Sequence, residues 1–202
     1  MNYYISDLHL FCKNQLMSSP HDYDNRPYRT LEDMHEDILA NWNKKVTNGD
    51  VVYLLGDVSR RGTNEALLSL VARLKGKKIL LKGNHDDLRD YRLQQLFFDI
   101  CDYKELTEHL DGTAYKLVLS HYPILMWNGQ HEGSILLYGH THTREEDIFF
   151  QKCIREMNQN TAIRHKGDPE FKAINVGCMH QYVNYEPRSL QELLKAYEVR
   201  TI

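Results

Sequence analysis

The sequence has the length and composition expected of one soluble domain over residues 1–202: 42% of its residues are apolar and 26% are charged. Its net charge of -3 excludes the broad basic surface that binds nucleic acid non-specifically, so large polyanions are not favoured partners. No apolar run approaches the roughly 18 residues of a membrane span and the first residues lack a signal-peptide pattern, so we expect no membrane partner.

Short apolar runs alternate with helical patterns along the first half of the chain. Residues 2–6 are predicted to form a strand. From Leu31 to Val46 apolar residues recur at helical spacing, with Thr30 as the N-cap and Gly49 as the stop. Further elements are predicted at residues 51–55 (strand), 64–76 (helix), 77–81 (strand) and near 87–97 (short helix).

The second half continues the alternation. Asp111 and Gly112 indicate a hairpin turn into a strand at 116–120, and strands at 134–139 and 172–177 flank a helix within 145–163. Ser189 and Glu192 form a capping box for a last helix at 190–197. Nearly continuous apolar strands between helices predict the α/β class, with a largely parallel sheet covered on its faces.

Chemically active side chains stand directly after five of the predicted strands. In open α/β sheets the ligands bind outside the carboxyl ends of the strands, so we expect these side chains to meet at one edge. Two pairs have an alternate-residue spacing, which places both side chains on one side of an extended chain. The residues concerned are Asp7, His9, Asp57, Asn84, His85, Asp86, His121, His140 and His142.

Each of these residues alone has a plainer explanation, as a turn former, a helix cap or a hydrogen-bonded loop histidine. Such explanations give no reason for their joint occurrence at strand ends. Oxygen and imidazole ligands without a thiolate suit Mn, Fe, Zn, Co or Ni. Seven such groups are too many for one tetrahedral zinc, but with Asp57 bridging they fit two ions about 3.5–4 Å apart.

The ordered motifs Asp-x-His, Gly-Asp, Gly-Asn-His-Asp, Ser-His and Gly-His-x-His, between residues 7 and 142, resemble the calcineurin-like metallophosphoesterase superfamily. Segments 25–28, 41–46, 121–129, 175–177 and 187–193 are similar to its small bacterial and phage-type branch. The resemblance implies a four-layer α/β/β/α sandwich with a second, mixed sheet. It also implies one ion held by Asp7, His9, Asp57 and His142, and another held by Asp57, Asn84, His121 and His140.

The resemblance further implies a hydrolase that cleaves a phosphomonoester or phosphodiester by in-line attack of a hydroxide bridging two divalent ions, with Mn favoured over Fe, Zn and Ni. His85 is the candidate for protonating the leaving oxygen, its alternative role being a supporting hydrogen bond. Arg61 stands where related protein phosphatases carry a phosphate-contacting arginine, although a surface position is equally compatible. Arg60 replaces their aspartate, which leaves Asp86 as the nearest acidic neighbour of His85 in sequence.

The acidic balance favours a small phosphorylated substrate such as a nucleotide. Scattered cysteines without a CxxC spacing indicate reduced thiols in a cytoplasmic protein. The alternative function is a catalytically silent metal-binding scaffold or protein-interaction module of the same fold. The sequence leaves open the roles of Arg26, Trp127, His131 and His180, of which Trp127 is expected either to stack on a substrate or, more simply, to pack under its own loop.

Overall fold

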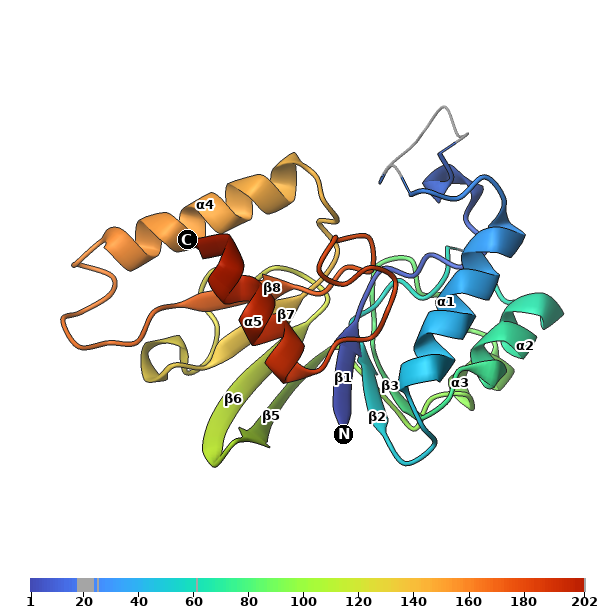
Figure 1. Cartoon of the computed structure of the whole chain (residues 1–202), viewed down its shortest axis with the longest axis horizontal. Coiled ribbons are helices and arrows are strands. Elements are labelled where there is room, and N and C mark those ends of the chain that lie inside the picture. The colour runs from blue at the N-terminus through green and yellow to red at the C-terminus, as the bar shows by residue number, and fades with distance from the viewer. Residues whose placement is uncertain (18–23, 25, 61, 202) are drawn as a thin grey trace.

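The first of two four-stranded sheets is entirely parallel (Figure 1). The computed structural model describes residues 1–17, 24, 26–60 and 62–201. The strands of this sheet lie in the order β1 (Asn2–Ile5), β2 (Val51–Leu54), β3 (Lys77–Leu81) and β4 (Asp99–Cys101). Because parallel strands point the same way, their carboxyl ends share one edge.

The second sheet is mixed. Its order is β5 (Tyr103–Leu110), β6 (Thr113–Ser120), β7 (Ile135–Tyr138) and β8 (Lys172–Asn175), and only the β5–β6 pair is antiparallel. Asp111 and Gly112 both have positive φ, 50° and 81°, as a two-residue type I′ hairpin turn requires. The hairpin predicted from this dipeptide is therefore confirmed.

Helices cover the outer faces of the two sheets. On the first sheet lie α1 (Leu31–Lys45), α2 (Glu65–Arg73) and the short α3 (Tyr91–Gln94). On the second lies α4 (Glu145–Gln159), whose Phe150 and Ile154 pack against Leu136 and Tyr138 of β7. Two short 3₁₀ helices, η1 (Lys13–Gln15) and η2 (Gln130–Glu132), lie in loops. Among the described residues no helix is long and apolar enough to cross a membrane.

A central hydrophobic cluster joins the inner faces of the sheets. Successive strand residues alternate between faces, so Tyr53 enters this cluster while Val52 and Leu54 face the helices. Leu119 and Leu137 meet it from the second sheet. The four layers confirm the expected α/β/β/α sandwich. The pattern-based expectation of one largely parallel sheet is incomplete, because strands that are apolar on both faces do not reveal which of them share a sheet.

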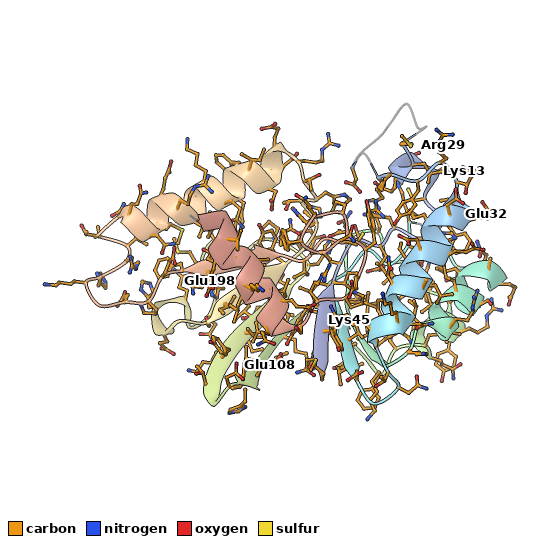
Figure 2. The ribbon with its side chains drawn as sticks, in the orientation of Figure 1. Lys13, Arg29, Glu32, Lys45, Glu108 and Glu198 are labelled. Atoms are coloured by element: carbon orange, nitrogen blue, oxygen red, sulfur yellow. The ribbon has the colours of Figure 1, made fainter. Side chains whose placement is uncertain are left out.

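The last helix, α5 (Leu190–Thr201), closes the space beside β1. Its Leu190 and Leu193 enter the central cluster. Lys45 lies at the end of α1 (Figure 2). It pairs with Glu186 at 2.8 Å and Glu192 at 2.5 Å, which holds the C-terminal segment to the helical layer of the first sheet. The predicted capping box is confirmed, because Ser189 N donates to Glu192 Oε2 at 2.8 Å.

The short helix predicted near 87–97 is present but shorter than that range. Only Tyr91–Gln94 is helical, with Asp90 as its N-cap, and the unpredicted strand β4 follows. Leu93 is the one residue of α3 that is buried, so there is little apolar face to extend a helix. β4 has three residues at a sheet edge, too few to give a period in the sequence.

Candidate metal centre

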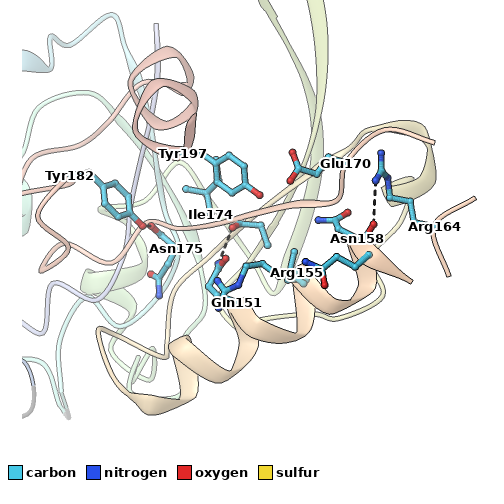
Figure 3. A pocket seen from close by; sticks show the side chains of 12 residues that line it. Gln151, Arg155, Asn158, Arg164, Glu170, Ile174, Asn175, Tyr182 and Tyr197 are labelled. Carbon is cyan, nitrogen blue, oxygen red and sulfur yellow. Dashed lines mark hydrogen bonds between the residues drawn. The ribbon is translucent and has the colours of Figure 1, made fainter. Parts of the chain in front are cut away.

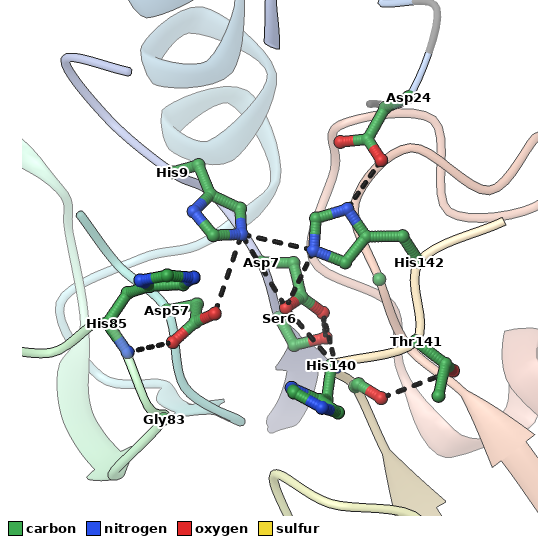
Figure 4. A network of polar contacts seen from close by, with 12 residues as sticks. Ser6, Asp7, His9, Asp24, Asp57, Gly83, His85, His140, Thr141 and His142 are labelled. Atoms are coloured by element: carbon green, nitrogen blue, oxygen red, sulfur yellow. Dashed lines mark hydrogen bonds and ion pairs between the residues drawn. The ribbon is translucent and has the colours of Figure 1, made fainter. Parts of the chain in front are cut away.

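All seven predicted ligand residues lie where the strand ends of both sheets converge. They follow β1, β2 and β3 in the first sheet and β6 and β7 in the second. The edges are brought together by backbone hydrogen bonds across β1 and the segment after β8: Ser6 N donates to Val176 O at 2.9 Å, and Cys178 N donates to Ser6 O at 3.0 Å. Figure 4 shows the resulting network, with Asp7 at its middle.

The backbone is unusual at these strand ends. Five of the seven residues have a left-handed φ although none is glycine: Asp7 (57°), His9 (47°), Asp57 (55°), His140 (69°) and His142 (51°). Such a conformation costs about 1–3 kcal/mol at each residue and is found where function requires a particular side-chain direction. The chain is thus turned sharply after β1, β2 and β7, and the side chains there point back toward one centre (Figure 4).

Glycines allow the loops to pack directly on the ligand side chains. A Cβ on Gly83 would lie 2.2 Å from Asp57 Oδ1. A Cβ on Gly139 would lie 2.6 Å from Asp7 Oδ2 and 2.4 Å from Ser6 Oγ. The glycines of the Gly-Asn-His-Asp and Gly-His-x-His motifs therefore serve the close approach of neighbouring loops.

A first group of ligand atoms comes from Asp7, His9 and His142, all buried. Nε2 of His9 and Nε2 of His142 are 3.1 Å apart, and Asp7 Oδ1 lies 4.0 and 3.5 Å from them. Ligand atoms around one tetrahedral ion, at about 2.0–2.2 Å from it, lie roughly 3.3–3.6 Å from each other. The spacing of the group therefore fits a shared cation.

A second group lies beside the first. His121 Nε2 is 3.7 Å from Asp57 Oδ2 and 3.1 Å from Asn84 Oδ1, and His140 Nδ1 is 2.9 Å from the same Asn84 oxygen. Asp57 Oδ2 is also 3.5 Å from His9 Nε2, so this carboxylate lies between the groups, as expected of a bridge. Asp7 belongs to both of the three-residue clusters able to hold an ion, a position that the sequence did not indicate.

Two of the imidazoles are oriented by hydrogen bonds at their other ring nitrogen. His121 Nδ1 is 2.7 Å from the backbone oxygen of Leu55, which directs Nε2 to the centre. His142 Nδ1 is 2.5 Å from Asp24 Oδ1. In contrast, His9 Nδ1 is buried and no described residue offers it a hydrogen bond that would offset its burial.

Asp24 and Arg26 form a buried support that sequence reasoning missed. Arg26 is 0% exposed, pairs with Asp24 at 2.9 Å and donates to the backbone oxygens of Asp7 and Leu8, each at 2.8 Å. Arg26 therefore braces the loop that carries the first ligands and does not reach a substrate. Arg26 was named from the sequence with its role left open, and no sequence signal indicated Asp24.

Burial and mutual contact shift the pKa values of the cluster. Burial raises the pKa of Asp57, and Asp7 beside it acts in the same direction. Burial and the neighbouring His142 hold the pKa of His9 well below its usual value. Burial alone would lower the pKa of His142, but Asp24 and Asp7 raise it. A bound cation stabilises buried, closely spaced groups of this kind, because it favours the ionised carboxylates and the neutral imidazoles that act as its ligands.

His85 and Asp86 have different surroundings. His85 N donates to Asp57 Oδ1 at 2.9 Å, and its ring lies 5.5 Å from that of His9, at the wall of the cavity described below. The Asp86 carboxylate accepts from the backbone N–H groups of residues 57, 58 and 83 at 2.8–2.9 Å, and burial raises its pKa to about 6. In the described part of the chain no hydrogen bond joins it to the His85 ring. Arg61 lies outside the described residues.

The three remaining candidates belong to neither ligand cluster and do not line the cavity beside it. Trp127 is buried and donates to Ser134 O at 3.1 Å, so it packs under its own loop. His131 is exposed and pairs with Asp168 at 2.9 Å. His180 is buried with its ring 5.2 Å from that of Tyr182.

A cavity of about 430 Å³ opens over the two groups of ligands. Besides candidate ligands and His85, its walls include Gln15, Arg60, Thr141, Arg144 and Glu146. A larger cavity of about 700 Å³ lies between α4, β8 and α5, and no candidate ligand lines it (Figure 3). There Asn158 pairs with both backbone groups of Phe171, and Gln151 donates to Ala173 O, so these amides cap the free edge of β8.

The family model of the calcineurin-like phosphoesterases matches residues 3–202. The chain belongs to this family. It is 29% identical over 205 residues to Methanocaldococcus jannaschii protein MJ1445, described as uncharacterized, covering 99% of this chain and 95% of that protein. It is 37% identical over 125 residues to the Gene 66 protein of Mycobacterium phage D29, covering 51% of this chain and 63% of the phage protein.

A solved structure has the same fold. The crystal structure of AQ665 from Aquifex aeolicus, a protein of unknown function, superimposes with a TM-score of 0.65 at 25% identity, covering 97% of this chain and 98% of that one. The resemblance to calcineurin-like phosphoesterases, and to their small bacterial and phage-type branch, is therefore confirmed. The clustered Asp and His side chains are positioned to bind a metal ion.

Proposed function

We propose that this family member is a hydrolase that cleaves a phosphomonoester or phosphodiester with the help of two divalent ions. The observation that carries the proposal is the gathering of seven oxygen and imidazole ligands, from both sheets, beneath an open cavity of about 430 Å³. That volume lies in the range of small-ligand sites, which favours a small phosphorylated substrate such as a nucleotide.

The ligand chemistry suits borderline divalent ions, and we favour Mn over Fe, Zn and Ni. When bound, two such ions neutralise phosphate charge and make a water molecule acidic enough to act as nucleophile near neutral pH. We assign Asp7, His9, Asp57 and His142 to one ion, and Asp57, Asn84, His121 and His140 to the other. Cys178 takes no part, because its Sγ lies against the backbone oxygen of Asp7 at 3.1 Å.

The remaining side chains orient the substrate and move a proton. His85 lines the cavity next to Asn84 and is our candidate for protonating the leaving oxygen. Arg60 lines the same cavity and is placed to attract phosphate, a role that we also retain for Arg61. Asp86 fixes the loops that carry Asp57 and Asn84, so we assign it to positioning the centre. The four free cysteines favour a reducing, cytoplasmic location.

The decisive experiment loads the protein separately with Mn, Ni, Fe and Zn and assays matched aryl phosphate monoester and diester substrates. We expect turnover of at least one substrate with at least one metal, lost on chelation and restored by adding the metal. Absence of turnover with every metal and both substrates would favour the silent scaffold of the same fold. The matched control is the metal-loaded Asp7→Asn variant.

A further inference from the structure

Gln15 is a buried residue at the wall of the cavity, and its amide oxygen has no hydrogen-bond partner among the described residues. Its residue is 3% exposed and lines the cavity together with His9, Asp57 and Arg60. Its Oε1 is shielded from solvent and accepts no hydrogen bond within the described ranges of the chain. The backbone is fixed nearby, because Gln15 N donates to Cys12 O at 3.2 Å and Leu16 forms a bridge with Arg26.

A second buried glutamine shows what a structural amide looks like in this protein. Gln130 is 4% exposed, but its Oε1 accepts from Trp127 N at 2.9 Å, and its Nε2 lies 3.8 Å from Met126 Sδ. An amide oxygen that is buried without a donor destabilises the folded protein, and such groups are explained by a functional role or by a ligand, ion or water that completes them. The two glutamines are similarly buried, but the amide oxygen of Gln130 has a donor within the protein and that of Gln15 has none among the described residues.

We propose that Gln15 turns its amide toward the cavity and binds the alcohol part of the phosphoester, and that this leaving group carries a hydrogen-bond donor. The inference rests on the proposed function, because the cavity holds the leaving group only if phosphate binds over the ligand cluster. The missing partner of Oε1 must be an O–H or N–H group, and the amide N–H₂ beside it can pair with an acceptor. A polyhydroxyl or amino-bearing alcohol, as in a sugar phosphate or a nucleotide, has both; a simple aryl phosphate has no donor.

A site of this kind discriminates strongly. When a substrate lacks the group that a buried polar side chain needs, that side chain stays unpaired in the complex and binding weakens. Loss of one such hydrogen bond reduces kcat/KM by about tenfold. Gln15 is thus a determinant of specificity and not of the chemical step.

The test compares Gln15→Met with Gln130→Met, using Mn-loaded protein. The substrates are 4-nitrophenyl phosphate, ribose 5-phosphate and adenosine monophosphate. We expect Gln15→Met to lose about tenfold more kcat/KM on a donor-bearing substrate than on the aryl phosphate, while its melting temperature stays equal or rises. Gln130→Met should lower the melting temperature and leave the substrate ratio unchanged. The donor-bearing substrate with the larger loss identifies the sugar or the base as the source of the donor.

Two results would overturn the inference: equal losses on all three substrates, or a lower melting temperature for Gln15→Met with an unchanged ratio. Cleavage of the aryl phosphate alone by the wild type would also overturn it, while leaving the phosphoesterase assignment intact. If the wild type cleaves nothing, the proposed function fails. Calorimetric titration of ribose 5-phosphate and adenosine monophosphate then decides, since the inference requires that Gln15→Met weakens binding of at least one of them.

Discussion

The two groups of candidate ligands differ in depth and in support. Asp7, His9 and His142 are buried, and His142 is held by the Asp24–Arg26 pair beneath the surface. In the second group Asp57 and His121 are buried, but Asn84 is exposed and His140 is half-buried, and these last two line the open cavity. A buried group whose charges are compensated is costly to rearrange, whereas a partly exposed one exchanges with solvent.

This difference in burial and support predicts that the two ions differ in affinity and in exchange rate. The side chains of the first group are already held in place by burial and by the Asp24–Arg26 pair, so this group is expected to bind its ion more tightly. The second group, with Asn84 exposed and His140 half-buried, is expected to exchange its ion faster. The following variants test this asymmetry.

The largest effect is expected from Asp57→Asn, because we assign Asp57 to both ions and its Oδ2 lies 3.5 Å from His9 Nε2 and 3.7 Å from His121 Nε2. Loss of a shared carboxylate removes the charge that holds both ions, and with them several kcal/mol of charge stabilisation, on the order of a thousandfold in rate. Metal content after desalting, together with kcat on an aryl phosphate, provides the measurement. A variant that keeps two ions and near-normal turnover would contradict the shared position.

His85→Ala should separate chemistry from metal binding. The His85 side chain lines the cavity but belongs to neither cluster. We expect a decrease of about 10²–10⁴-fold for esters with poor leaving groups, a much smaller one for activated aryl esters, and unchanged metal content. Equal losses on both ester classes would argue against a proton donor and for a supporting hydrogen bond.

Asp24→Asn and His140→Ala test the asymmetry directly. Removing the carboxylate behind His142 should weaken the tighter ion by about 10–100-fold, while His140→Ala should affect only the weaker ion. Isothermal titration calorimetry with Mn measures the affinities of the two ions separately. An Asp102→Asn variant, at an exposed ion pair, serves as control. If both variants weakened the same ion, the two groups would not be independent.

The contact between Asp24 and His142 makes metal binding depend on pH. Asp24 and Asp7 raise the pKa of His142 in the metal-free protein, so its ring holds a proton up to higher pH than usual. Protons then compete with the metal, and the affinity of the tighter ion falls as the pH decreases through that raised pKa. In Asp24→Asn the pKa of His142 decreases, and the fall in affinity should move to lower pH. A titration series from pH 5 to 8 provides the check.

Gly83→Ala is expected to have a smaller, structural effect. The added Cβ would stand 2.2 Å from Asp57 Oδ1, so a loop or the carboxylate must shift. Overpacking of this kind costs about 1–3 kcal/mol in the free energy of unfolding and should displace the bridging ligand. Gly49→Ala is the matched control, because its nearest contact would be 3.8 Å away. Chemical denaturation and metal content measure the difference, and equal behaviour of the two variants would contradict the packing argument.

The sequence predicted the site best where residues able to bind a metal follow successive strands. His140 and His142 after an apolar run, and Asp57 after another, indicated both the edge of the sheet and the ligand types. The layers were predictable only through the family resemblance, because alternation of buried residues on both faces does not show how strands divide between sheets. That residues 1–202 form one domain stays a prediction.

The support beneath the centre could not be predicted. Asp24 and Arg26 act through contacts with residues far away in sequence, and a charged pair in a long loop has no periodicity. The left-handed φ at Asp7 and His142 is likewise imposed by packing and contradicts local preference. Gln15 was invisible for the same reason, since only the fold shows that its amide is buried and unpaired.

The central claim is that two cations occupy these two groups side by side. The most direct test is anomalous diffraction at the manganese edge from a crystal soaked in Mn. We predict two peaks roughly 3.5–4 Å apart, one among Asp7, His9 and His142 and the other beside Asp57, Asn84 and His121. Absence of both peaks, with the histidine rings turned away from each other, would contradict the account.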